Sequence, residues 1–259
     1  LSKLGFTLPV LEQDLKELNG RIELTSSRIN VKHIEGMIDK GSFNVDGYID
    51  LDQYRPSDFS FNTGTNNLTL EIPDQLSMIL NSDITVRGNQ EKSTISGIVT
   101  LLEGLYYKNI EFNLLQSVTK KKIAPLPERK KHQNKYLENM ELDISVTRRK
   151  PFLIDNNMAL MDLSPNLHIG GTAVQPVISG QAKVDTGIVM FRNNEFQIKK
   201  GVIDFLNPYK IEPTIDIASE TEIREWIINM DISGTPDNLT FTLTSTPKEE
   251  HEDILSLLL

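Results

Sequence analysis

Apolar and polar residues alternate along most of this chain, as they do in a β-strand that buries one face. In residues 42–51, Phe43, Val45 and Ile49 fall on one face, and the polar residues between them fall on the other. The same alternation recurs in residues 68–72, 84–86, 142–146, 215–217, 228–232 and 239–243. So many short strands predict an all-β protein.

Clusters of Gly, Asn, Asp, Lys and Pro separate the predicted strands. We predict that the chain reverses at residues 39–41, 87–89, 193–194, 199–201 and 234–237. With a turn at 199–201, the stretch from Gly187 to Pro208 would hold three short strands rather than two.

Helix signals are few. In residues 8–20, the leucines at 11, 15 and 18 have helical spacing and Gly20 follows as a stop, so a short helix is predicted. A second helix is predicted near the end, where Pro247 precedes four acidic residues and the apolar run from Ile254. The expected fold therefore contains few and short helices.

Residues 78–104 align without a gap on residues 161–187, which makes them two copies of one repeat. The identical pairs are Met78/Met161, Leu80/Leu163, Gly88/Gly171, Ile95/Ile178, Ser96/Ser179, Gly97/Gly180 and Gly104/Gly187. Repeats of this kind indicate an elongated architecture in which each unit packs on its neighbours. Glycines kept at the same places indicate repeated backbone geometry with positive φ.

Charge and composition narrow the function classes. The net charge of −9 argues against nucleic acid as the main partner, because phosphate binding favours a basic surface. Residues 116–135 form a basic, proline-containing segment, which we predict to be a solvated loop or a patch for anionic lipid headgroups or an acidic partner. The chain has no cysteine, and no stretch approaches the ~20 apolar residues of a membrane span.

No motif for catalysis or metal binding is found in the sequence. The phosphate-binding GxxxxGK[ST], the nucleophile elbow GxSxG and the zinc motif HExxH are all missing, and the four histidines are isolated. For an enzyme, Asp50 with Asp52, or Asp204, would be the first candidates, but no second carboxylate can be placed opposite them. We expect no enzyme, no cofactor and no metal.

From about residue 165 to 258 the sequence resembles the C-terminal region of the TamB family, the translocation and assembly module proteins within the AsmA-like group of bridge-like lipid transfer proteins. Earlier residues resemble the family only as a looser strand repeat. The family-motif residues, which we expect in turns, are Gly171, Pro176, Gly180, Gly187, Gly201 and Pro213. We expect one β-rich unit from a longer chain, with first repeats at 1–115, the basic loop at 116–135 and TamB-like repeats at 136–259.

The resemblance implies an elongated, curled and taco-shaped antiparallel sheet with an apolar inner face. It also implies a periplasmic protein anchored in the inner membrane through an N-terminal segment outside this sequence. Two roles follow from it: phospholipid transport between the membranes, or docking of an outer-membrane Omp85-type barrel partner for protein insertion or secretion. The expected partners are therefore phospholipid acyl chains, the barrel protein and membranes.

An apolar inner face can form a dry core or an open groove that holds acyl chains. Burial of an acyl chain is worth about 0.8 kcal/mol per CH₂. The predicted lining residues of such a groove are Val184, Val189, Phe191, Phe196, Ile198, Ile203, Phe205, Ile215, Ile217, Ile228, Met230, Ile232, Leu239, Phe241 and Leu243. The competing interpretation is that most of them pack on one another.

Overall fold

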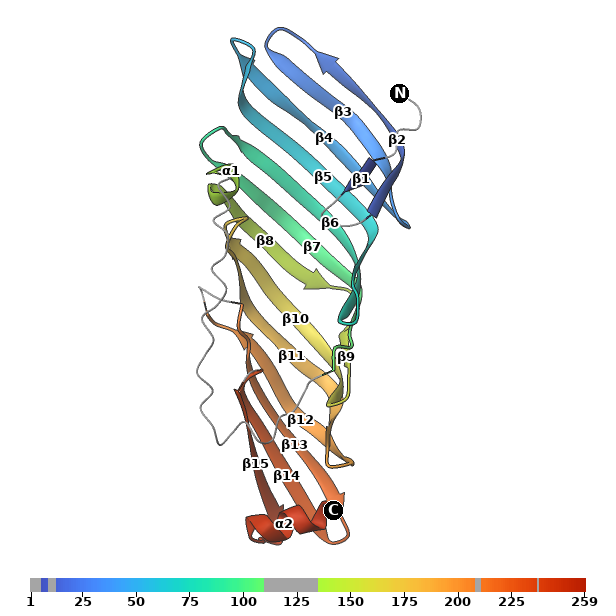
Figure 1. Cartoon of the computed structure of the whole chain (residues 1–259), viewed down its shortest axis with the longest axis vertical. Coiled ribbons are helices and arrows are strands. Elements are labelled where there is room, and N and C mark those ends of the chain that lie inside the picture. The colour runs from blue at the N-terminus through green and yellow to red at the C-terminus, as the bar shows by residue number, and fades with distance from the viewer. Residues whose placement is uncertain (1–5, 9–12, 110–134, 208–210, 237) are drawn as a thin grey trace.

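The structure is a computed structural model, and it describes residues 6–8, 13–109, 135–207, 211–236 and 238–259. Within these residues, fifteen strands join in one sheet and follow one another along the long axis of the molecule (Figure 1). The strands are β1 (Phe6–Leu8), β2 (Gln13–Leu24), β3 (Arg28–Ile38), β4 (Gly41–Asp52), β5 (Arg55–Ile72), β6 (Leu76–Asn89), β7 (Ser93–Tyr106), β8 (Met140–Arg148), β9 (Phe152–Asp155), β10 (Ala159–Gly171), β11 (Pro176–Phe191), β12 (Asn194–Phe205), β13 (Thr214–Ile223), β14 (Trp226–Thr235) and β15 (Asn238–Thr246). The predicted all-β, elongated and curled sheet is confirmed.

Neighbouring strands are antiparallel except where β8 and β9 pair with β7, which are both parallel pairings. β8 pairs with β7 in parallel, from Ser93 opposite Met140 onward, and its other side pairs antiparallel with β10. The short strand β9 continues the line of β8 and also lies between β7 and β10. The sheet therefore runs without interruption past the long chain segment that separates β7 from β8.

The sequence repeat corresponds to two equivalent hairpins. Met78 on β6 lies opposite Gly104 on β7, and Met161 on β10 lies opposite Gly187 on β11. The register also shifts one residue later in both copies, after Ile79 and after Asp162. The two hairpins thus share pairing and the same irregularity, as the repeat predicts.

β-Bulges interrupt several strands of the N-terminal half. The register shifts at Glu17 on β2, at His33 on β3 and near Asn67 on β5, and all three residues have positive φ. A bulge leaves one residue unpaired and increases the local twist of a sheet. These bulges therefore help long strands, such as the 18 residues of β5, to bend with the sheet.

Several predicted turns need correction. The reversals at 39–41 and 193–194 are confirmed, but residues 199–201 lie inside β12. Gly180, Gly187 and Gly201 also lie inside strands, and only Gly171 ends a strand at a turn. The Lys-Lys-Gly cluster marks a bulge between Ile198 and Lys200 rather than a reversal. Pro176 begins β11 and Pro213 directly precedes β13.

The structure has two short helices in its described part, α1 (Lys135–Glu138) and α2 (His251–Leu257). The helix predicted at 8–20 is wrong, because residues 13–24 form β2 and pair with β3, so pairing overrides the leucine spacing. The C-terminal helix is confirmed, although it begins at His251 rather than next to Pro247. The basic segment 116–135 lies outside the described residues except for Lys135, at the beginning of α1.

Two hydrophobic clusters of unequal size stabilise the sheet. The larger one is formed mainly by β10–β15 and α2, and the smaller one centres on Leu80, Leu101 and Val146. The accessible surface of the chain is 17905 Å². A compact protein of this mass would expose only about 11,500 Å². The molecule therefore leaves much more of its surface uncovered than a globular domain does.

Candidate functional site

One side of the sheet is apolar from strand to strand. Residues directly opposite each other in a ladder lie on the same side of a sheet. One such row, from β4 to β10, consists of Val45, Thr63, Ile84, Gly97, Ile144 and Ile169. A parallel row consists of Gly47, Phe61, Val86, Ile95 and Leu142. We call this side of the sheet the apolar face.

In β3–β8, which we call the open half, the apolar face is only partly covered. Within the described residues of these strands, the buried apolar side chains are Ile38, Leu80, Leu101 and Val146. None of these four belongs to the two rows, whose apolar residues, such as Phe61, Ile84 and Val86, are half-buried. Side chains in a packed core would lose nearly all contact with solvent. The open half therefore presents a hydrophobic surface across several strands.

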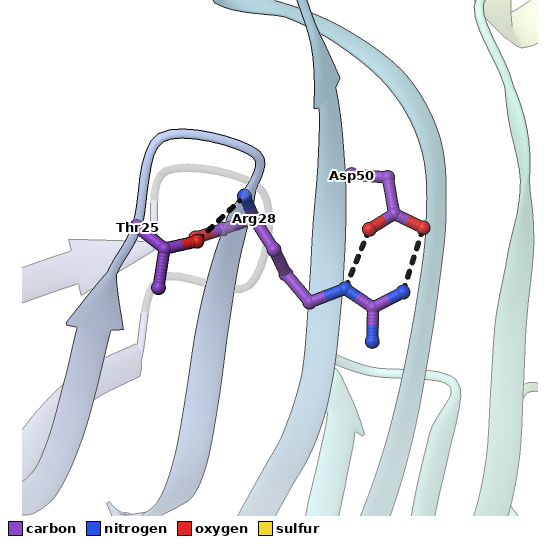
Figure 2. A network of polar contacts seen from close by, with 3 residues as sticks. All are labelled: Thr25, Arg28 and Asp50. Carbon is purple, nitrogen blue, oxygen red and sulfur yellow. Dashed lines mark hydrogen bonds and ion pairs between the residues drawn. The ribbon is translucent and has the colours of Figure 1, made fainter.

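The opposite side of the open half is polar and is held by ion pairs. The Arg28 guanidinium donates two hydrogen bonds to Asp50, with Nε–Oδ1 2.5 Å and Nη2–Oδ2 2.9 Å (Figure 2). Its Cζ also lies 4.1 Å from the centre of the Tyr48 ring. The hydrogen bond from Arg28 lowers the pKa of Asp50 from its ordinary value of 3.8. The pair links β3 to β4, and Thr25 accepts the Arg28 backbone N–H at the turn before β3.

The other end of the molecule, β10–β15 with α2, is rolled up, and we call it the closed end. Phe191 on β11 and Phe241 on β15 stack with ring centroids 6.2 Å apart. Four inter-strand steps separate β11 from β15, which would be about 19 Å in a flat sheet. The sheet must therefore curl until these two strands face each other across the apolar interior.

The helix α2 completes the closure. Ile254 and Leu258 are each 1 % exposed and belong to the large cluster. Asn194 donates its side-chain N–H to the carbonyl oxygen of Leu258 at 2.9 Å, and the Trp226 indole donates to Glu249 at 3.0 Å. The helix lies across the end of the sheet, beside the last strands (Figure 1). It covers the closed end from the side where β15 ends.

The structure brings the predicted lining residues together. All of them except Phe205 belong to the large cluster, either as buried members or packed against it. Phe196, Ile228 and Met230 are 0 % exposed, so in this conformation their side chains contact only the protein. Phe205 is half-buried on the apolar face opposite Gly180. That these residues line a lipid path stays a prediction.

Sequence reasoning missed the open half as a candidate site. The alternation around Phe43, Leu68 and Ile84 predicts strands there, but the predicted lining residues all lie where the family resemblance is strongest. The half-buried Val99 could have been found by carrying the face assignment through the repeat, since Val99 occupies the place of Ala182, whereas Phe61 lies outside the repeat.

The candidate catalytic carboxylates remain separate. Asp50 is engaged by Arg28, Asp52 is exposed, and Asp204 lies 3.4 Å from the Gln181 amide. Among the described residues there is no group of three His, Cys, Asp or Glu residues placed to hold a metal ion. A shallow pocket of about 390 Å³ lies near the bulges of β2 and β3, and polar residues including His33 and Glu35 line much of it. Its lining suits water better than an acyl chain.

Comparison with known families gives one match that covers most of the chain. The family described as TamB C-terminal domain matches residues 32–259. The match begins within β3 and thus includes the open half as well as the closed end. No curated protein matches the chain. Neither helix in the described part of the chain is long and apolar enough to cross a membrane.

Proposed function

The chain belongs to the TamB family, and from this premise we propose that it carries phospholipid acyl chains on its apolar face during transport between the inner and outer membranes. Family membership gives it a role in transport or assembly related to the outer membrane. The lipid, the periplasmic location and the anchoring in the inner membrane are parts of the proposal.

The observation that supports lipid binding is the uncovered apolar face of the open half. Exposed apolar patches on soluble monomers rarely exceed a few hundred Å², and larger ones mark binding surfaces. The rows through Ile84 and Val86 cross several strands and are only half-buried. A surface of this kind favours a long apolar ligand that lies across successive strands.

The energy scale suits a lipid carrier. Transfer of a 16-carbon chain from water to such a face would be worth roughly 10 kcal/mol at full burial, at about 0.8 kcal/mol per CH₂. An acyl chain that is only partly covered gains less free energy on binding, so it can dissociate again into a membrane. Neither binding nor release requires a catalytic group, so we propose that the protein acts without catalysis.

A second candidate function is assembly of outer-membrane proteins through strand pairing. Within the described residues, β15 is the last strand of the sheet and pairs only with β14. A sheet edge offers unpaired backbone N–H and C=O groups to an extended strand of another protein. The edge of β15 supports docking of a barrel partner, and one chain can serve both functions.

Substitution of Val99 tests the lipid proposal. Val99 lies on the apolar face of β7, and its neighbour Ile98 points to the polar side and is 50 % exposed. We expect Val99→Asp to reduce the phospholipid that organic solvent extracts from the purified protein, as measured by mass spectrometry, and to slow lipid transfer between liposomes. Both should stay unchanged in Ile98→Asp.

The control places the same charge on the same strand but on the other side of the sheet. Ile98 lies opposite Asp83, so Ile98→Asp also adds a like charge to the ladder. Absence of phospholipid in the unchanged protein, or equal losses in the two variants, would contradict the proposal. Crosslinking of β15 to a barrel protein, together with lipid transfer that is unaffected by prolines in β15, would favour the assembly function.

A further inference from the structure

The apolar face does not end where the open half ends. Val146 on β8 lies opposite Leu167 on β10, Leu167 lies opposite Gly180 on β11, and Gly180 lies opposite Phe205 on β12. The same side of the sheet thus continues into the interior of the closed end, where it meets the Phe191–Phe241 stack. The strand ladder is continuous from the open half to the closed end. The two regions differ in how far other side chains cover the apolar face.

The helix α2 rests on hairpin turns between strands of the closed end, and we call these turns its seat. Arg192 donates to the carbonyl oxygen of Leu255 at 3.3 Å, and Asn194 donates to that of Leu258. Both belong to the β11–β12 turn region, whereas Trp226 is the first residue of β14, directly after the turn that follows β13. The helix itself follows β15. It therefore bridges the turns of the strands that form the roll.

The helix depends on this seat. A helix of seven residues is too short to be stable by itself in water. Its N-cap residue Glu250 forms no side-chain cap hydrogen bond, and its last turn carries no basic residue. Two fully buried side chains, Ile254 and Leu258, together with the hydrogen bonds from the turns, hold it in place. Leu255 and Leu257 also pack against the large cluster, so α2 depends on its contacts with the sheet.

We infer that α2 is a releasable closure of the closed end. An acyl chain bound on the open half can continue onto β11–β15 only after α2 leaves its seat and the Phe191–Phe241 stack parts. This inference rests on the proposed lipid-binding function, and it names how access to that site is regulated. Release would convert the dry interior of the roll into a continuation of the lipid surface.

Leu258 and Leu259 provide a matched pair for the test. They are adjacent leucines, but Leu258 is 1 % exposed and Leu259 is 95 % exposed. Leu258→Asp should release α2, because an unpaired carboxylate is strongly disfavoured in an apolar interior. Leu259→Asp is the same substitution at an exposed position, so it does not carry this penalty. Trp226, the single tryptophan of the chain, contacts Glu249 just before α2 and reports release by a red shift of its emission.

The measurement maps where an acyl chain lies. A phosphatidylcholine with a diazirine in one acyl chain is presented in phosphatidylcholine vesicles, and the adducts are located by mass spectrometry. We expect adducts on β5–β7 in every form of the protein. Adducts on β11–β15 should rise at least about fivefold in Leu258→Asp, through the shift in population, and stay at the basal level in Leu259→Asp.

A gentler variant covers the case in which Leu258→Asp loses its β-sheet circular dichroism. Arg192→Ala combined with Asn194→Ala removes two hydrogen bonds to α2 without placing a charge in the interior. It should raise labelling of β11–β15 in the same direction by a smaller factor. Equal labelling of β11–β15 in the unchanged protein would overturn the closure. So would a red shift of Trp226 without new adducts there. Absence of adducts on β5–β7 in all forms would overturn the lipid function itself.

Discussion

The hairpins β6–β7 and β10–β11 have the same pairing but are covered differently. Met78 and Met161 occupy equivalent places opposite a glycine, yet Met161 is 5 % exposed and Met78 is half-buried. The local sequence pattern fixes the register in both hairpins. Burial depends on the rest of the sheet, because the C-terminal strands roll up and α2 packs against them.

This difference separates two uses of one apolar face. In the closed end the face packs on itself and supplies stability, with Phe196, Ile228 and Met230 fully buried. In the open half the same pattern leaves hydrophobic area exposed, which costs stability and leaves a surface for a ligand. Substitutions at comparable positions should therefore affect stability in the closed end and binding in the open half.

The largest expected effect is in the closed end. Phe196→Ala should lower the free energy of unfolding by about 3–5 kcal/mol, because it leaves a cavity among buried side chains. Phe61→Ala in the open half should cost roughly 1–2 kcal/mol, since its ring is half-buried. Urea unfolding followed by Trp226 fluorescence and by circular dichroism measures both. Equal costs would show that the two regions are packed alike.

The equivalent methionines give a smaller but closer comparison. Met161→Ala should destabilise the protein by about 2–3 kcal/mol, and Met78→Ala by about 1 kcal/mol or less. Both side chains lie on the apolar face opposite a glycine. The difference in stability between the two variants therefore measures how far the rest of the protein covers each methionine. Thermal unfolding of the two variants provides the measurement. A larger effect at Met78 would contradict the assignment of an open half.

The equivalent glycines should respond alike. Gly97 and Gly180 have φ of +147° and +109°, and a Cβ on either would collide with a backbone carbonyl oxygen of the neighbouring strand. Alanine at either position should cost about 1–3 kcal/mol, because the cause is local backbone geometry. Denaturant unfolding of the pair tests this expectation. If only Gly180→Ala is destabilising, hairpin geometry is not shared as the register indicates.

The smallest effect is expected on the polar side of the open half. The hydrogen bond from Arg28 lowers the pKa of Asp50 from its ordinary value of 3.8. The ionised carboxylate therefore stabilises the fold above pH 3.8, and this stabilisation is lost as the pH falls through the lowered pKa. Asp50→Asn should therefore lower the midpoint of thermal unfolding at pH 7 by no more than about 2 °C. The difference should vanish in acid. A loss of lipid binding in this variant would contradict the assignment of the two faces.

The sequence allowed much of the fold to be predicted, for physical reasons that individual elements illustrate. Period-2 alternation predicted strands such as β4, and the repeat predicted that β6–β7 and β10–β11 share their pairing. Where the prediction was wrong, tertiary contacts overrode the local sequence pattern. β2 has leucines at helical spacing but pairs with β3, and Lys199 to Gly201 form a bulge within the β12 ladder.

The site was less predictable. The Phe191–Phe241 contact joins strands that are four steps apart, and it follows from sheet curvature that accumulates over many residues. No short sequence pattern encodes such curvature. The predicted lining residues other than Phe205 lie in or against one cluster. Residues that stay uncovered, such as Ile84 and Val99, have the same alternating pattern, and only the curvature of the sheet separates them from the covered ones.

A crystal structure of the protein purified with its bound lipids tests the central claim most directly. The account predicts continuous elongated density along the apolar face of β3–β8, in contact with Phe61, Ile84 and Val99, while the interior beneath α2 stays dry. An apolar face of β3–β8 sealed by the protein's own side chains or by a second copy of the chain, with no density along it, would contradict the account.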